Sequence, residues 1–308
     1  MPPAKNKLQF LFFLFVIFCF KINAQPFIDI ISYNNQIFFS EYKDSSHNPV
    51  FIQDHFLNLF IPVKFGKGNV ILFRINSEKL ELNRTAKLNS SSQLFSISAP
   101  VGLQLVSKNQ KWKCTGIFIT KINSDFKDDL SKDLQFGGIG LVTKVINENL
   151  QVRLGLYYNK EFFGDFFMPL GGIDWKINNK WQMYGTLPSN FRIEYNIYKS
   201  WNTGLGFRSF LRSFRLNNIY SNDFIWIREN QLKIYFEGAI YKNLFITVDV
   251  FRSIAYRMPR NDFKSVRSNQ IEKSGIPVFA PFKDNFGFTI GFAIRVMTKK
   301  QEKEKSAE

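Results

Sequence analysis

The chain is poor in the residues from which catalytic and metal sites are built. It has 2 His and 2 Cys among 308 residues, and a serine-type hydrolase would need His47 or His55 beside a nucleophile such as Ser46. The sequence contains no phosphate-binding glycine loop, zinc-ligand spacing or dinucleotide fingerprint. We predict no catalytic residue, metal or cofactor. The alternative is an outer-membrane hydrolase that acts on lipid and uses one of the histidines.

One stretch collects acidic side chains without the pattern of a calcium loop. Asp125, Asp128, Asp129 and Asp133 lie close together, but the stretch lacks the glycine and final glutamate of such a loop, and lysines interrupt it. We expect a solvated loop there.

A long hydrophobic run is also missing. The apolar segment Leu8 to Phe20 is thirteen residues long, whereas a membrane-spanning helix needs about 20. Lys5 and Lys7 precede it and Ala24 follows it, as in an export signal cleaved after Ala24. We predict a signal peptide at 1–24, a barrel domain at 25–297 and a charged tail at 298–308. The mature chain then retains only Cys114, which excludes an intrachain disulfide.

The basic excess is dispersed along the chain. Lys and Arg number 41 against 25 Asp and Glu, a formal charge of +16, but the basic residues occur mostly singly, and nucleic-acid binding needs a contiguous patch. We therefore predict no nucleic-acid partner and expect outer-membrane lipids instead.

Alternation with period two dominates what is present. In the last predicted strand Phe286, Phe288, Ile290, Phe292 and Ile294 alternate with small or polar residues. Runs of this kind, separated by turn residues, predict fourteen strands at 28–42, 50–65, 69–83, 93–107, 111–123, 134–147, 150–162, 169–177, 180–187, 190–198, 201–215, 223–240, 243–257 and 285–296.

The connections between these strands alternate between short turns and longer polar segments. Short turns are predicted near residues 66, 109, 148, 178, 199 and 241. Longer segments are predicted at 43–49, 84–92, 124–133, 163–168, 216–222 and 258–284, with a tight connection at Pro188-Ser189 as the exception. Outer-membrane barrels have short periplasmic turns and longer outer loops. The fold class predicted is all-β, a transmembrane antiparallel up-and-down barrel of about 14 strands, with 12 as the alternative.

Two sets of side chains support a barrel in lipid over a soluble periplasmic β protein, which stays as a further alternative. Four tryptophans flank short turns, as expected of a girdle at the membrane interface: Trp112, Trp175, Trp181 and Trp201. Charged residues on the polar face predict a lumen network, because a charge facing lipid would cost about 2–4 kcal/mol at mid-bilayer: Arg153, Asp174, Arg192, Glu194, Arg208, Arg212, Glu237, Asp249 and Arg252.

Several segments resemble a known family. The Ala-Gln junction at 24–25, the Trp181 to Pro188 arm with the Phe-Arg-Ile-Glu-Tyr that follows it, Gly204-Leu-Gly-Phe-Arg and Gly287-Phe-Thr-Ile-Gly-Phe are similar to an uncharacterised outer-membrane β-barrel family abundant in the Bacteroidota. The resemblance implies this fold and the outer membrane of a Gram-negative cell, and it brings no activity.

The end of the chain departs from the usual barrel pattern. Barrels commonly end on an aromatic residue that the barrel-assembly machinery recognises, whereas this chain continues into the charged tail. If that machinery is a partner, we expect an internal insertion signal around Phe286 to Phe292. The function predicted is a narrow or partly plugged channel for small solutes, with the solute unknown.

Overall fold

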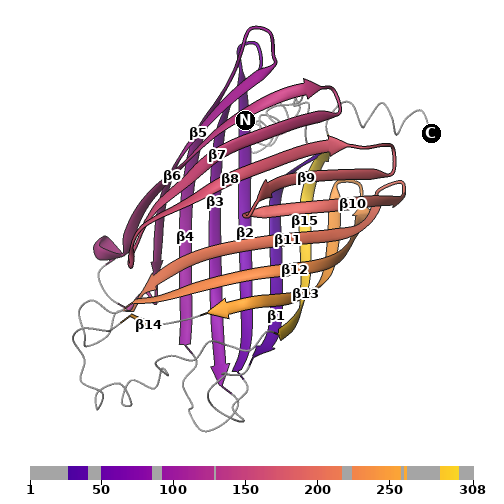
Figure 1. The fold of residues 1–308 in the computed structure, drawn as a ribbon. Coiled ribbons are helices and arrows are strands. Elements are labelled where there is room, and N and C mark those ends of the chain that lie inside the picture. Colours follow the sequence, from indigo (N-terminus) through magenta and orange to yellow (C-terminus); the bar gives the residue numbers. More distant parts are fainter. Residues whose placement is uncertain are drawn as a thin grey trace, which may run out of the picture.

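Long antiparallel strands form a closed barrel in the computed structural model (Figure 1). The structure describes residues 27–40, 50–84, 92–127, 130–216, 224–257, 260–261 and 285–297. The strands are β1 (Phe27–Ser40), β2 (Val50–Phe65), β3 (Asn69–Arg84), β4 (Ser92–Val106), β5 (Trp112–Ser124), β6 (Leu134–Asn147), β7 (Leu150–Glu161), β8 (Gly164–Lys176), β9 (Trp181–Leu187), β10 (Asn190–Tyr198), β11 (Trp201–Arg215), β12 (Phe224–Tyr241), β13 (Leu244–Arg257), β14 (Arg260–Asn261) and β15 (Asn285–Met297), with one 3-10 turn η1 (Leu130–Asp133).

Each wall strand pairs with its neighbours along the chain, and β1 closes the ring by pairing with β15. Of the fifteen strands, the two-residue β14 pairs only with β12, so fourteen form the wall. Phe27 lies opposite Met297. The start of β1 and the end of β15 therefore lie together at the end of the barrel that carries the short turns.

The predicted strands agree with the structure to within two residues at every boundary except one. The longer connection predicted at 163–168 is wrong, because β8 already begins at Gly164 and only Phe162 and Phe163 separate it from β7. Residues 164–169 continue the ladder to β7, with Asn159 opposite Phe166 and Leu156 opposite Pro169. Pro169 fits in this strand because its missing N–H lies on the edge away from β7.

The barrel is apolar outside and polar inside. On β15 the predicted apolar face is exposed, with Phe286 at 69% and Ile294 at 45%, whereas Ala293 and Arg295 on the other face are buried. On β12, Leu232, Ile234 and Phe236 are likewise exposed. This is the reverse of a soluble protein, in which exposed apolar residues are scattered.

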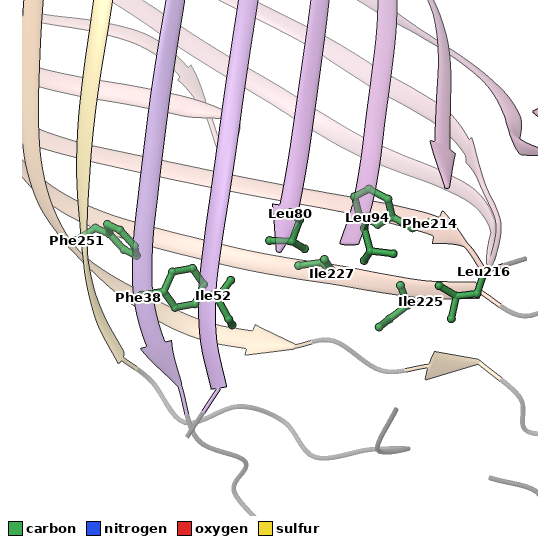
Figure 2. Packing of buried hydrophobic residues seen from close by; sticks show 9 residues of the cluster. All are labelled: Phe38, Ile52, Leu80, Leu94, Phe214, Leu216, Ile225, Ile227 and Phe251. Atoms are coloured by element: carbon green, nitrogen blue, oxygen red, sulfur yellow. The ribbon is translucent and has the colours of Figure 1, made fainter. Parts of the chain in front are cut away.

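An apolar cluster fills the interior at the end that carries the long connections (Figure 2). Its members come from opposite walls, β1–β4 on one side and β11–β13 on the other, and all are at most 4% exposed: Phe38, Ile52, Leu80, Leu94, Phe214, Leu216, Ile225, Ile227 and Phe251. The two walls thus meet across the interior at this end.

Gly287 of β15 tests how tightly this cluster is packed. A Cβ atom built on Gly287 would collide with the Phe251 ring. We expect Gly287→Val to lower the free energy of unfolding by about 1–3 kcal/mol through overpacking, measured by urea titration in detergent micelles. Gly116→Val is the matched control, because a Cβ on Gly116 meets no atom within 4 Å. Equal effects of the two substitutions would contradict the packing described.

The wall of the barrel is shorter along the strand direction at one hairpin than elsewhere. The hairpin of β9 and β10 is short, with strands of 7 and 9 residues. β9 pairs with β8 only from Gly171 to Lys176, and β10 pairs with β11 only as far as Arg208. Beyond the tip of this hairpin, β8 and β11 have no strand between them.

Candidate functional site

The interior face carries a layered set of buried ion pairs, and the first layer lies near the short-turn end. Arg295 of β15 contacts Asp29 of β1 through Nε and Oδ1 at 2.7 Å and Glu237 of β12 through Nη1 and Oε1 at 2.7 Å. Arg192 of β10 reaches the other oxygen of Glu237 at 3.0 Å. The Arg295 guanidinium also lies 4.4 Å from the Phe245 ring centroid. This network joins four strands across the barrel.

Glu194 of β10 lies beside this layer and is fully buried. Its Oε2 accepts hydrogen bonds from the hydroxyls of Tyr184 at 2.9 Å and Tyr235 at 3.0 Å, and Oε1 accepts one from Gln182. Three donors thus replace the water that the carboxylate loses on burial.

Two further pairs lie on the interior face of the middle strands. Arg153 of β7 contacts Asp174 of β8, whose Oδ2 also accepts a hydrogen bond from Gln151 at 2.6 Å. Lys233 of β12 contacts Asp249 of β13 at 3.2 Å. Each pair links neighbouring strands and places a charged group in the interior.

Arg212 of β11 makes the layer closest to the apolar cluster. Its two terminal nitrogens contact Asp54 of β2 at 2.8 Å and Glu78 of β3 at 2.9 Å. Arg208, four residues earlier on the same face of β11, has its guanidinium 4.6 Å from the Phe56 ring centroid. Both arginines thus reach from β11 to the opposite wall, so the interior is spanned by side chains at this level.

Arg252 differs from the other eight residues predicted to line the lumen. It is exposed, whereas its neighbours Phe251 and Ser253 are buried, and its guanidinium lies 5.7 Å from the ring centroid of Phe286 on the outward face. The prediction placed it with the polar face because it is charged. The alternation of β13 places it outside, near the end of the strand, where its side chain can reach water.

This placement gives a direct comparison between two arginines. We expect Arg252→Ala to change the free energy of unfolding by no more than about 0.5 kcal/mol, as at an ordinary surface position, and to leave any single-channel conductance unchanged. Arg212→Ala should alter both quantities, because it leaves Asp54 and Glu78 buried without their cation. Planar-bilayer recording and urea titration would measure the difference, and a larger effect of Arg252→Ala would contradict the orientation of β13.

β11 does more than form the wall. The Ser213 side chain points away from those of Arg212 and Phe214, toward the interior side of β5–β7. There it is hydrogen-bonded to buried polar residues. Its hydroxyl donates to Glu161 Oε2 at 2.6 Å, and its backbone N–H donates to the same oxygen at 3.1 Å. Asn123 donates to the Ser213 carbonyl at 3.0 Å. We call Lys121, Asn123, Gln135, Glu161 and Ser213 the Ser213 cluster.

The Ser213 cluster holds the far half of β11 inside the barrel. Lys121 Nζ lies 2.6 Å from Glu161 Oε1, and Gln135 donates to the Ser213 hydroxyl at 3.1 Å. Arg215 pairs in parallel with Ser124 of β5, although five strands lie between β11 and β5 around the shorter side of the ring. One face of β11 therefore contacts β2 and β3 and the other contacts β5–β7, so that β11 divides the interior.

Sequence reasoning missed the residues that complete these layers. Asp29, Asp54, Glu78, Glu161 and Arg295 were not singled out, although Arg295 occupies the polar face of the last strand. Alternation alone could have found Arg295, but it could not have found Asp54, which shares its face of β2 with apolar Ile52 and Phe56. Nothing in the sequence showed that β11 leaves the wall, because its contacts with β5 and β7 join strands that are far apart in the sequence.

The four tryptophans gather at one end of the barrel. Trp112, Trp181 and Trp201 begin β5, β9 and β11, and Trp175 is the last but one residue of β8, all at the short-turn end. Trp112, Trp175 and Trp181 are exposed. Trp201 stacks on Phe236 of the outward face with ring centroids 5.1 Å apart.

The residues considered for other chemistry form no catalytic arrangement in the described part of the chain. His55 Nδ1 is hydrogen-bonded to the Tyr33 hydroxyl at 2.7 Å, and both side chains lie on the outward face. Asp133 is buried, 3.8 Å from Arg215 Nε, not in a solvated loop. His47, Ser46, Asp128 and Asp129 lie outside the described residues, as do the predicted signal peptide, the segment 262–284 and the tail 298–308.

Among the residues that the structure describes, no group of three or more His, Cys, Asp or Glu is arranged to hold a metal ion, and Cys114 is a free, exposed thiol. None of the described helices is long and apolar enough to cross a membrane.

Comparison with solved structures finds chains of low sequence identity. The COG4313 outer membrane channel from Pseudomonas putida F1 is 7% identical, with a TM-score of 0.49 over 89% of this chain and 98% of that chain. The translocator domain of the autotransporter NalP from Neisseria meningitidis is 8% identical, with a TM-score of 0.38 over 94% of this chain and 95% of that chain. A mutant of the monoaromatic hydrocarbon channel TodX is 7% identical, with a TM-score of 0.44 over 86% and 89%.

Comparison with sequences gives a family without an activity. No curated protein matches the chain. A family model matches residues 73–295, from within β3 to within β15, and confirms the resemblance to a family of unknown function. The match spans most of the barrel, and the chain therefore belongs to the family described as Domain of unknown function (DUF6268).

Proposed function

We propose that the protein is an outer-membrane β-barrel of a Gram-negative cell that acts as a narrow, partly plugged channel for small solutes and has no catalytic activity. The observation that carries the proposal is the reversed burial of the wall, apolar outside and charged inside. A sheet that closes on itself pairs its first strand with its last, which makes a barrel the β structure able to span a bilayer. Apart from β9 and β10, the wall strands have 12–18 residues, more than the roughly 9–11 that a tilted crossing needs.

The filled interior supports a narrow path. The apolar cluster, the Arg212 layer and the Arg295 network occupy three successive levels between opposite walls. Barrels of about 8 strands are filled by side chains or hold one small ligand, whereas barrels of 16–18 strands leave an aqueous channel. A wall of fourteen strands lies between these widths. A solute in the barrel would pass between paired charges, and this lining favours solutes that are small and polar.

The tryptophans and the termini support an orientation in the membrane. Trp prefers the headgroup level, where the apolar ring meets water, and we propose that Trp112, Trp175, Trp181 and Trp201 mark the periplasmic interface. The short turns, the start of β1 and the end of β15 then face the periplasm, as in other outer-membrane barrels. Outer-membrane lipids and the barrel-assembly machinery are the partners that this proposal requires, with Phe286 to Phe292 as the insertion signal.

Gel migration with and without boiling, combined with membrane fractionation, tests the location. We expect the protein in the outer-membrane fraction, with a faster-migrating unboiled form, because a hydrogen-bonded barrel resists unfolding by detergent at room temperature. Planar-bilayer recording of the unboiled form should then give small conductance steps. Extraction by salt or carbonate with no heat shift would overturn the proposal and favour a soluble periplasmic protein.

The hydrolase alternative has its own test. Purified protein should release no fatty acid from phospholipid vesicles, and His47→Ala and His55→Ala should behave as the parent protein does. Release that either substitution abolishes would establish the hydrolase instead.

A further inference from the structure

Two strand edges lie beyond the hairpin tip without a strand between them. Residues Gly164–Leu170 of β8 pair with β7 only, and residues Phe210–Arg212 of β11 have β12 as their antiparallel neighbour but not β10. The β8 edge is seven residues long, or about 23 Å at 3.3 Å per residue, whereas the β11 edge is three residues long, or about 10 Å. The wall is therefore interrupted above the tip of the hairpin of β9 and β10, where the outward surface is apolar.

The β11 edge is fixed at two points. Near the hairpin tip, Ser209 N–H donates to the Pro188 carbonyl at 3.0 Å. Near the other end, Ser213 binds Glu161 in the Ser213 cluster. The stretch between these points is Phe210 to Arg212, about 10 Å long. Leu211 is two residues before Ser213, so the two side chains lie on the same side of β11.

The β8 edge lacks one of its backbone donors. Lys176 N–H donates to Asn149 on the β7 side, and Ile177 N–H donates to Trp181 on the β9 side. Even-numbered residues of β8 thus bond toward β7 and odd-numbered ones toward β9. Pro169 is an odd-numbered residue, and it has no N–H to offer at the open edge. Proline at an edge is a common means by which proteins prevent another strand from pairing there.

Apolar side chains surround the interruption. β8 contributes Phe166, Met168 and Leu170, and the hairpin tip contributes Leu187. Toward the long-connection end, Phe162 and Phe163 between β7 and β8 lie against Phe224 and Trp226 of β12, with ring centroids 6.3 and 6.0 Å apart. These aromatic contacts and the Ser209–Pro188 hydrogen bond bound the interruption at its two ends.

We infer that the interruption between β8 and β11 is a lateral window through which small apolar molecules pass between the barrel interior and the bilayer, with Leu211 standing in it. The inference rests on the proposed location in the outer membrane. An aqueous exit would carry mainly polar residues where Phe166, Met168, Leu170 and Leu187 lie. A docking site for a further strand would keep every donor at the edge, whereas Pro169 removes one in the middle of it.

Fluorescence quenching by lipid tests the window. Single cysteines are placed in a Cys114→Ala background, labelled with bimane and reconstituted into phosphatidylcholine vesicles with or without bromine on the acyl chains. We expect Leu211→Cys to be quenched by brominated lipid to at least half the extent of Leu232→Cys on the outward face. Asn58→Cys, whose side chain bonds Ser32 on the interior face, should be unaffected.

Uptake of an apolar dye tests the passage. Cells that produce the protein should take up 1-N-phenylnaphthylamine several-fold faster than cells without it, and Leu211→Trp should remove most of that difference while conductance to KCl stays unchanged. Leu211→Cys quenched no more than Asn58→Cys, or dye uptake unchanged by Leu211→Trp, would overturn the window. Failure of the heat shift would instead overturn the proposed location, so the two failures are distinguishable.

Discussion

Replacing Glu237 by alanine is expected to destabilise the barrel strongly. Glu237 is fully buried and receives Arg192 and Arg295 on its two oxygens. Removing one partner of a buried pair costs about 3–5 kcal/mol, because the remaining charge stays in a medium of low dielectric constant. Urea titration followed by tryptophan fluorescence in detergent micelles would measure the loss.

Glu81→Ala is the matched control for Glu237→Ala. Glu81 of β3 also pairs with a basic residue, Lys79, but that lysine side chain is 38% exposed. An exposed pair contributes up to about 1 kcal/mol. Similar losses for the two substitutions would show that the Arg295 network is hydrated and that the barrel is open at this level.

Replacing Glu161 by alanine is expected to free the far half of β11. The side chain is fully buried, and it binds Lys121, Asn159 and Ser213 at 2.6–2.8 Å. Its loss leaves the Lys121 ammonium buried without a counter-charge and the Ser213 N–H without its acceptor, which together cost about 3 kcal/mol or more. We expect larger single-channel conductance in planar bilayers, because β11 no longer divides the interior.

Lys160→Ala is the control for the Glu161 experiment. Lys160 is the preceding residue of β7, and it is exposed on the outward face. It should change neither conductance nor the urea midpoint. If Glu161→Ala lowers stability but leaves conductance as in the parent protein, the position of β11 is maintained by Arg212 and the apolar cluster instead.

The strands could be predicted because each is determined by its own alternation and by the turn that follows it. Gly66 and Gly68, with φ of 57° and 117°, mark the turn between β2 and β3 in the sequence itself. The start of β8 was misplaced because Pro169 normally interrupts a strand. It lies in β8 only because the edge that it occupies has no partner, and that depends on the length of β9, which is not a local property.

The kind of residue that lines the interior could be predicted, but the partner that each of these residues binds could not. Alternation placed Arg192, Glu194 and Glu237 on one face, yet it could not show that Glu194 binds two tyrosines while Glu237 binds two arginines. Those contacts depend on the stagger between strands. Arg252 shows the limit of an argument from charge, because a residue near the end of a strand can face outward and still reach water.

The pairing of β1 with β15 also sets the order in which the protein can assemble. Every other wall pair joins strands that follow one another along the chain, except the contact of β11 with β5. The ion pair between Asp29 and Arg295, by contrast, joins residues 266 positions apart. Such a contact forms late, because closing a loop of that length has a high entropic cost. Synthesis must therefore reach the final strand before the ring can close. Until then the nascent sheet has an unpaired strand edge on each side, and a chaperone must cover these edges to prevent aggregation.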